Sequence, residues 1–405
     1  MLRTIHITVL ASISKLLSYV LALCLLPTAV QAQEDVIRLV PEVVAETDDA
    51  DGSPTDVLSP AEWQRVDAAV NRALAWLVAQ QQPDGSFPTL SNGQPGVTSL
   101  CVLAFMAQGH NPGEGQYGDQ LERATKFILS CQKDNGLIAL EGPGGPRISR
   151  NVDYWIGVTT AYNHAIASLT LSEIYGMGGT QRTERLQEVI DQSLATTLEM
   201  QRWPKDHEID KGGWRYVNNF DEMDSDLSIT GWNLMFLRSA RNAGFDVPKT
   251  AIDAAVGYVR RTFDKNESVF IYSTVPGDSR SRAMAGAGIL ALAHAGFHDS
   301  VEAQKSGQWL LQHSFDEYNG NNGIRLDRYH YSLFNSCQGM YQLGSPYWEK
   351  FFPPTVKALL AAQAGDGSWE AESFHRDRQF GNSYTTALVV LSLGAPNQFL
   401  PVFQR

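Results

Sequence analysis

Residues 72–87 read RALAWLVAQQQPDGSF, residues 123–138 read RATKFILSCQKDNGLI, and residues 359–369 read LLAAQAGDGSW. Each copy ends an amphipathic helix with a glutamine and places a glycine four residues later. Two of these copies place an aromatic residue two positions after the glycine. A motif that recurs along one chain indicates a repeat architecture, in which each unit buries its apolar face against its neighbours.

The repeated unit is a helix, a glycine-containing turn and a second helix. Ser59-Pro60-Ala61-Glu62 is a capping box with proline at the first helical position, so a helix is expected to begin there. The second helices are expected to begin near residues 98, 159, 228, 283, 329 and 384, and they are rich in small residues. Six such pairs predict an all-α fold, an (α/α)6 barrel (toroid) of six helical-hairpin repeats. An open solenoid is the alternative arrangement.

The glutamine and the glycine of the repeat are expected to serve the scaffold. The amides of Gln81, Gln132 and Gln363 can bond to neighbouring backbone groups, and a glycine permits a tight exit from a helix. Units three to five depart from the motif, since Phe263 and Ser314 stand where a glutamine is expected.

Two segments precede the expected barrel. Residues 1–32 have the features of a secretory signal, with Arg3 and Lys15, a leucine-rich run over 16–26, and small residues at 30 and 32. An uncleaved membrane anchor is the alternative. Residues 33–58 form an acidic linker with eight acidic residues against one arginine, and residues 59–405 are expected to form the toroid. The protein is therefore expected to be exported to the periplasm or beyond the cell, with contact to a membrane surface left open.

The composition limits the function classes. A hydrophobic content of 43% over 405 residues is too high for a disordered chain. The net charge of −12, without a basic patch, argues against nucleic acid as a partner. Cys101, Cys131 and Cys337 lie in apolar helical contexts, which predicts buried thiols, with a Cys101–Cys131 disulfide as the alternative.

The pattern Arg-Ala-x-x-Trp-Leu-x-x-x-Gln-x-x-x-Gly-x-Phe at 72–87 resembles the QW repeat of squalene–hopene and oxidosqualene cyclases. Protein prenyltransferase β subunits have related repeats. The resemblance covers about residues 60–395 and implies an α/α toroid. It says less about the reaction, because one fold carries many functions.

Residues 212–232 read GGWRYVNNFDEMDSDLSITGW, which resembles the segment of squalene–hopene cyclases that leads into their DxDD acid motif. On that pattern Asp224 takes the place of the first aspartate. Asp226 takes that of the middle aspartate, which in that family protonates an alkene or epoxide, and Leu227 replaces the third. The resemblance implies an exported terpenoid-cyclase-like protein that cyclises or binds a hydrophobic polyprenyl substrate. Asp226 is then the candidate acid and Asp224 its support.

Protonation of an alkene requires a neutral carboxyl group and a cavity of aromatic rings that stabilises a carbocation. A helix start favours the charged carboxylate instead, so Asp224 as a plain N-cap is the structural alternative. The aromatic residues expected to bind the substrate are Trp155, Trp214, Trp232, Phe236, Tyr329, Tyr331 and Tyr384.

Prenyltransferases hold zinc with Asp, Cys and His, and here His330, between two tyrosines, is the one candidate ligand for a metal. Its alternative role is that of a hydrogen-bonded structural histidine, and no metal or other cofactor is expected. Two further functions remain open. One is a polysaccharide-active or glycan-binding barrel, for which Asp153, Asp224, Asp226 and Asp327 could supply carboxylates. The other is a non-catalytic repeat scaffold.

Overall fold

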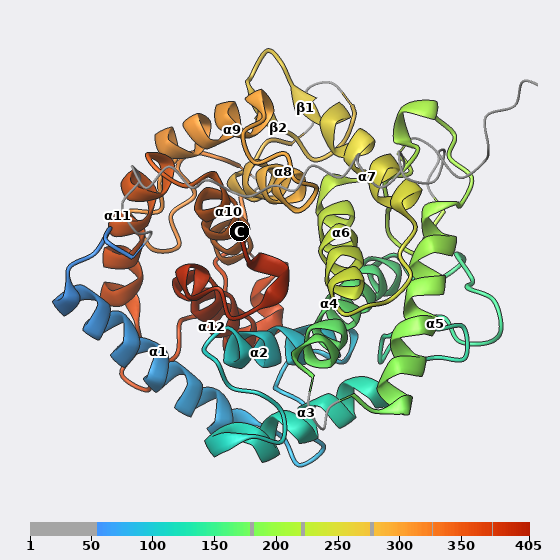
Figure 1. Cartoon of the computed structure of the whole chain (residues 1–405), viewed down its shortest axis with the longest axis horizontal. Helices are drawn as coiled ribbons and strands as arrows, with labels where there is room; N and C mark the ends of the chain where they lie inside the picture. Colours follow the sequence, from blue (N-terminus) through green and yellow to red (C-terminus); the bar gives the residue numbers. More distant parts are fainter. Residues whose placement is uncertain (1–54, 179–181, 220–222, 276–278, 326, 375) are drawn as a thin grey trace, which may run out of the picture. The chain divides into compact units, whose positions relative to one another are not determined.

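The computed structural model describes residues 55–405 apart from 179–181, 220–222, 276–278, 326 and 375. Over these residues, α-helices alternate between an outer and an inner layer (Figure 1). The outer helices are α1 (Pro60–Gln80), α3 (Gly118–Ser130), α5 (Glu184–Gln201), α7 (Lys249–Arg261), α9 (Val301–Gln312) and α11 (Tyr347–Ala362). The inner helices are α2 (Gly96–Met106), α4 (Tyr154–Met177), α6 (Leu227–Asn242), α8 (Arg282–His294), α10 (Tyr329–Leu343) and α12 (Gly381–Leu393).

The inner helices form a closed ring. Each packs against the next in chain order, and α12 returns to contact α2. In the outer layer α1 contacts α11, so the last pair meets the first. The predicted (α/α)6 barrel is therefore confirmed, and the open solenoid is excluded. One two-residue hairpin, β1 (Phe263–Asp264) with β2 (Val269–Phe270), follows α7.

Small residues allow the inner helices to approach closely. Every residue of α8 is buried. A Cβ added at Gly286 would lie 2.5 Å from the backbone of Asn335 and Ser336 in α10, so only glycine fits there. The outer helices instead have one buried face, as in α1, where Val66, Ala73 and their neighbours point inward.

The glutamine of the repeat joins one unit to the next. Gln81 donates from Nε2 to the carbonyl oxygens of Gly85 (3.0 Å) and Gln120 (2.8 Å), and its Oε1 accepts from Arg123 Nη2 at 2.7 Å. Gly85 has φ +93°, and a Cβ there would lie 2.4 Å from the Arg123 carbonyl oxygen. The motif therefore fixes the contact between the end of one outer helix and the start of the next, as expected.

The same contact closes the ring. Gln363, after α11, donates to the carbonyl oxygens of Gly367 (2.9 Å) and Ala69 (2.8 Å), and its Oε1 accepts from Arg72 in α1. The third unit, which departs from the motif in sequence, also makes the contact. Gln201 donates to the carbonyl oxygens of Gly212 (2.8 Å) and Ala251 (2.9 Å) across a longer turn.

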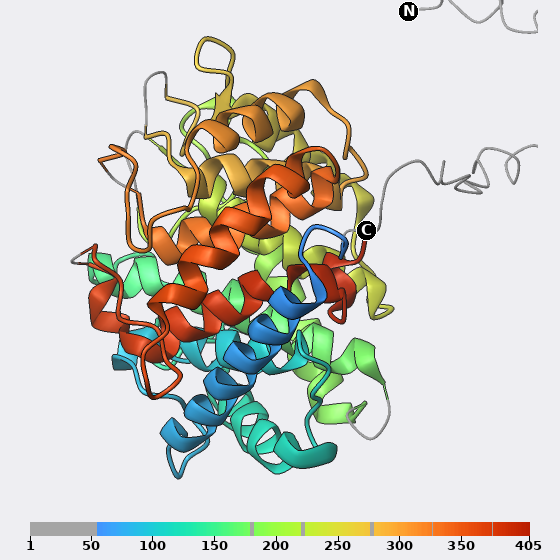
Figure 2. The same ribbon diagram turned by 90° about the vertical axis from the view of Figure 1, so that its left-hand side faces the viewer.

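The C-terminal segment covers one end of the barrel. Short 3-10 turns at Ala395–Asn397 and Pro401–Phe403 contact inner helices, and Leu400, Val402 and Phe403 are buried. Gln342 donates to the Phe403 carbonyl at 2.6 Å. Figure 2 shows the C-terminus on one side of the ring and the loops that lead into α10 and α12 on the other.

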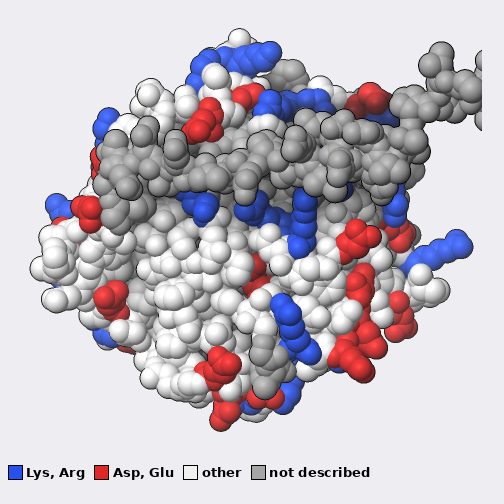
Figure 3. Space-filling model, in the orientation of Figure 1, with Lys and Arg blue, Asp and Glu red and all other residues white. Residues whose placement is uncertain are grey.

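The surface of the described unit carries charges of both signs. Figure 3 shows the end face that bears the C-terminus, where acidic side chains gather along the right-hand edge, over α5. The exposed acids of α5 are Glu184, Glu188, Asp191 and Glu199.

The predicted signal and most of the acidic linker lie outside the described residues. Among those that are described, no helix is long and apolar enough to cross a membrane. Cys101, Cys131 and Cys337 are free and buried, which is the expected state rather than the alternative disulfide. Burial raises the pKa of Cys131 to about 11.

A candidate binding site in the central cavity

A cavity of about 340 Å³ lies at the end of the barrel where the inner helices begin. All six inner helices contribute residues to its wall, including Leu100, Tyr162, Ser228, Met284, Tyr331 and Tyr384. Loops that precede inner helices add Arg215, Tyr272, Arg328, Arg376, Asp377 and others. The cavity is thus the hollow of the barrel, open at the end opposite to the C-terminal segment.

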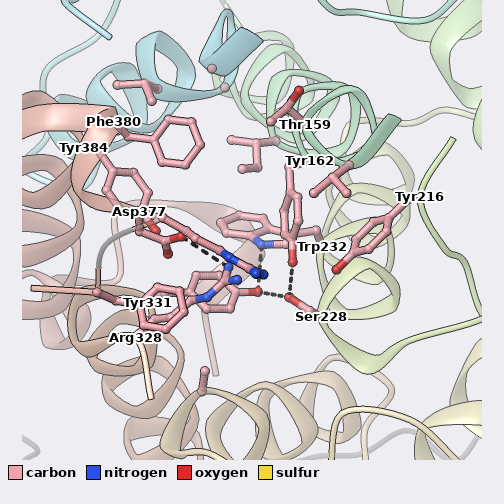
Figure 4. A pocket seen from close by; sticks show the side chains of 18 of the residues that line it. Thr159, Tyr162, Tyr216, Ser228, Trp232, Arg328, Tyr331, Asp377, Phe380 and Tyr384 are labelled. Atoms are coloured by element: carbon pink, nitrogen blue, oxygen red, sulfur yellow. Dashed lines mark hydrogen bonds and ion pairs between the residues drawn. The ribbon is translucent and has the colours of Figure 1, made fainter. Parts of the chain in front are cut away.

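A chain of hydroxyl groups crosses the middle of the cavity (Figure 4). The Tyr162 hydroxyl and Ser228 Oγ lie 2.8 Å apart, and Ser228 Oγ lies 2.6 Å from the Tyr331 hydroxyl. Trp232 Nε1 donates to the same Tyr331 hydroxyl at 3.1 Å. Burial raises the pKa of Tyr162, and the pKa of Tyr331 reaches about 12, so both phenols stay protonated at neutral pH. The three hydroxyls share two hydrogen bonds, so one O–H of the chain remains to donate to a ligand.

Arg328 points into the middle of this group (Figure 4). Its Nη1 lies 3.5 Å from Asp377 Oδ1, and 36% of its side chain is accessible. Burial opposes the guanidinium charge, but Asp377 and the tyrosines around it keep the pKa of Arg328 above its ordinary value. Burial raises the pKa of Asp377, and Arg328 opposes that rise. Asp377 is the one carboxylate among the described residues that line the cavity.

Asp226 lies behind the wall. Its Oδ1 accepts from the Ile229 N–H at 2.9 Å, which makes Asp226 the N-cap of α6, and its Oδ2 lies 3.0 Å from Arg215 Nη1. Burial raises the pKa of Asp226, whereas Arg215 and the cap bond oppose that rise. The Arg215 guanidinium separates Asp226 from the cavity and favours its charged form.

Asp224 fixes the loop before α6. Its Oδ2 accepts from the Asp206 N–H at 2.8 Å, and its Oδ1 lies 3.7 Å from Arg150 Nη2. Asp224 is buried and is neither the N-cap nor part of the cavity wall. The two aspartates therefore serve different local contacts and do not share a proton.

Aromatic rings stand at the mouth. Tyr154 is 47% exposed and Trp155 is 40% exposed, at the start of α4. The guanidinium of Arg376 lies 5.2 Å from the centre of the Trp155 ring. Exposed rings of this kind offer a flat apolar face to a ligand, while Arg376 adds a charge beside them.

Four of the predicted substrate-binding aromatics line the cavity, namely Trp155, Trp232, Tyr331 and Tyr384. Trp214 lies in the turn of the third repeat, where its N–H donates to Thr230 Oγ1 and its ring nitrogen donates to the Thr197 carbonyl. Phe236 is fully buried in α6, and Tyr329 packs against Phe315 and Tyr318. The structure thus places Trp214, Phe236 and Tyr329 in the packing of the barrel.

His330 is a hydrogen-bonded residue at the start of α10. Its Nδ1 lies 2.9 Å from Glu372 Oε2, and its Nε2 lies 2.9 Å from the Tyr318 hydroxyl. The described residues contain no group of three or more His, Cys, Asp or Glu side chains that could hold a metal. Both ring nitrogens of His330 are occupied by protein partners.

Sequence reasoning missed the arginines and Asp377. Arg328 directly precedes α10, and Asp377 lies four residues before α12. The signal that could have found them is positional, because every segment that leads into an inner helix reaches the same end of the barrel. The resemblance to the DxDD motif directed attention to one of these segments alone.

Comparisons with known proteins support the fold and go no further. No family model matches the chain, and no curated protein matches its sequence. A D-mannose isomerase structure matches with a TM-score of 0.57 at 12% identity, covering 85% of this chain and 99% of that one. A wild-type glycosidase matches with a TM-score of 0.54 at 10% identity, covering 85% and 100%. The type II terpene cyclase MstE from Scytonema matches with a TM-score of 0.51 at 15% identity, covering 84% and 99%.

The chain therefore has the α/α barrel fold that a sugar isomerase, a glycosidase and a terpene cyclase share. At such identities the likeness concerns the fold alone. The choice between these activities has to come from the side chains of the cavity.

Proposed function

We propose that the protein binds a saccharide in the central cavity. The observation that carries this proposal is the set of polar groups that crosses the middle of the cavity (Figure 4). The hydroxyls of Tyr162, Ser228 and Tyr331 and the guanidinium of Arg328 lie there. A sugar ring presents hydroxyls around its edge and apolar C–H faces, which suits this wall and the exposed Trp155.

The same distribution argues against cyclisation of a polyprenyl chain. A hydrocarbon placed in the middle of the cavity would exclude water from the hydroxyl chain and from Arg328, whose N–H groups are not all satisfied by Asp377 at 3.5 Å, and this costs free energy. The candidate acid Asp226 is paired with Arg215 at 3.0 Å, which favours a carboxylate and not a proton donor.

Proton transfer to or from a bound sugar would fall to Asp377. It is the carboxylate that lines the cavity in the described part of the chain, and burial raises its pKa, whereas Arg328 opposes that rise. Hydrolysis by two carboxylates is not supported by the described lining residues, which supply one. Export, expected from residues 1–32, would bring the protein to saccharides outside the cytoplasm.

The test is a saccharide panel of neutral and acidic oligosaccharides, titrated calorimetrically into the chain that begins at residue 33. We expect binding that Trp155→Ala weakens about tenfold, a loss of about 1.4 kcal/mol. Phe399→Ala removes another exposed aromatic ring, one that is not part of the cavity wall, and should leave binding unchanged. No binding by any saccharide would refute the proposal.

A polyprenyl ligand is the second candidate because the base of the cavity is apolar. Leu100, Ile166 and Leu388 line it, and Trp232 stacks on Phe334 with ring centres 5.4 Å apart. The panel therefore includes squalene and a shorter polyprenol in detergent. Saturable binding of either, with no saccharide bound, would favour this second function, and a cyclised product lost in Asp226→Asn would establish terpenoid chemistry.

A further inference from the structure

The described wall of the cavity carries more positive than negative groups. Arg215, Arg328 and Arg376 line it together with the single carboxylate of Asp377. Arg215 is balanced from behind by Asp226 at 3.0 Å. The remaining set is two guanidiniums and one carboxylate, since Arg328 Nη1 lies 3.5 Å from Asp377 Oδ1 and Arg376 directly precedes Asp377 in the chain. This local charge is opposite in sign to the net charge of the chain, −12.

The donors of Arg328 are not used up by the protein. Its distance of 3.5 Å to Asp377 exceeds the roughly 2.7–2.9 Å of a direct charge-assisted hydrogen bond. Within the described part of the chain Arg328 has no other carboxylate partner, and it packs over the Phe374 ring at 5.2 Å. A guanidinium has five N–H donors, so several remain for a ligand in the cavity.

Arg376 adds a second positive group at the open end of the cavity, beside Trp155. It is exposed, lies over the Trp155 ring, and has no ion pair among the residues that the structure describes. A guanidinium at this distance from a ring makes no hydrogen bond to it, so its N–H groups can bind an anion. A sugar that stacks beside Trp155 would therefore carry a substituent within reach of Arg376.

The N-termini of the inner helices add to the positive charge at this end of the cavity. All six begin at this end of the barrel, and the N-terminus of a helix carries about half a positive charge. Asp153 and Asp226 cap α4 and α6. The Glu372 carboxylate accepts from the His330 N–H at the start of α10 at 2.9 Å, and Asn163 Oδ1 accepts from the first N–H of α2 at 2.9 Å. The residue before α12 makes no side-chain cap. The start of α12 therefore adds to the positive charge of the arginines, and the inference of an anionic ligand depends mainly on the arginines.

We propose that the cavity takes an anionic saccharide, whose carboxylate or sulfate ester is held by Arg328 and Arg376 beside Trp155. This inference rests on the proposed function and narrows it, since a neutral sugar would leave one of these two guanidiniums without a countercharge. The carboxylate of a uronic acid and a sulfate ester share the required chemistry, a compact anion with several acceptor oxygens.

The experiment uses matched ligands that differ in charge. An oligogalacturonide is compared with its methyl ester, and a sulfated galactan oligosaccharide with its desulfated form, by calorimetry at low and high salt. We expect at least one anionic form to bind about tenfold tighter than its neutral partner, with the difference shrinking as salt rises. Binding of the first pair would assign a uronate, and of the second a sulfate ester.

Variants of single arginines test whether the anion binds in the cavity or elsewhere on the protein. Arg376→Gln should weaken the anionic form several-fold and leave its neutral partner unaffected. Arg328→Gln should weaken the anionic form more than its neutral partner, because Arg328 also belongs to the polar groups of the proposed sugar site. Arg378→Gln, in the same loop and not lining the cavity, is the matched control and should bind as the wild type does. Thermal unfolding of each variant shows whether it has folded.

The outcomes distinguish the two proposals. If neutral forms bind as tightly as anionic ones, or if Arg376→Gln weakens neither, the anionic inference is overturned while saccharide binding stands. If no saccharide binds, both proposals are overturned.

Discussion

The Asp226–Arg215 ion pair gives the sharpest test of what the Asp-Ser-Asp segment at residues 224–226 does. The perturbation is Asp226→Asn, which keeps the size of the side chain and an oxygen that can accept from the Ile229 N–H. Asparagine is as good an N-cap as aspartate, so the cap on α6 is retained. The substitution therefore removes the negative charge beside Arg215 and little else.

The expected cost follows from burial. The Asp226 side chain is 0% accessible and that of Arg215 is 10% accessible, with 3.0 Å between the paired atoms. Breaking a buried pair by removal of one partner costs about 3–5 kcal/mol, because a charge is left without its counterion. Arg215 keeps the Tyr272 hydroxyl at 3.2 Å and the Tyr216 ring, so we expect the lower end, about 3 kcal/mol.

Thermal unfolding followed by circular dichroism at pH 7 measures this cost, as a fall in Tm of about 6 °C if each kcal/mol is worth about 2 °C. The double variant Arg215→Met, Asp226→Asn removes both charges and should recover most of the loss. A single variant that unfolds at the wild-type temperature, or a double variant no better than the single one, would refute the role of a structural ion pair.

Three further outcomes follow from the packing. Gly367→Ala should lower Tm clearly more than Gly115→Ala, since both glycines have positive φ but only the Gly367 Cβ would strike a backbone atom, the Arg72 carbonyl oxygen, at 2.6 Å. Equal shifts in differential scanning calorimetry would show that close approach at the ring closure does not matter. Burial raises the pKa of Glu173 to about 7, from 4.5, so its contribution to stability is present below about pH 4.5 and is lost as pH rises through about 7. The Tm of Glu173→Gln minus that of the wild type should therefore be larger at pH 8 than at pH 5. A Tm difference that does not depend on pH would contradict this. Phe403→Ala should cost about 3–5 kcal/mol in urea unfolding, because the ring is buried, and should leave ligand affinity unchanged, because it lies at the end opposite to the cavity; a loss of affinity would show that the two ends are coupled.

The fold could be predicted because its determinants are local. The helix start at Pro60 follows from the capping box, which is present as expected, with Glu62 accepting from the Ser59 N–H at 2.8 Å. The inner helices begin within a few residues of the expected positions because small and apolar residues mark a helix that is buried all round. The pattern does not reveal Gln201 because Gly212 follows it by eleven positions, whereas the glycine follows by four in the other copies.

The candidate site could be predicted only in part. Trp155, Trp232, Tyr331 and Tyr384 were found because aromatic residues near the start of an inner helix tend to face the hollow. Trp214 looked equivalent by sequence, yet its backbone N–H is bonded to Thr230 in the following helix, just as Trp369 is bonded to Thr386. An aromatic residue in a turn and one in the cavity wall look alike in the sequence. They are distinguished by the hydrogen-bond partner of the turn residue, which lies too far along the chain for a local pattern to reveal it.

The repeat motif and the cavity use different residues, and this limits what the motif can say about function. Gln81, Gln201 and Gln363 bind the backbone of the next outer helix, and none of them lines the cavity. The wall is built instead by the segments that enter the inner helices, which the ring brings to one end. Those segments are separate from the glutamine contacts, so one scaffold can carry different sites. If the anionic-saccharide proposal holds, the arginines at this end, and not the repeat motif, decide which ligand this barrel accepts.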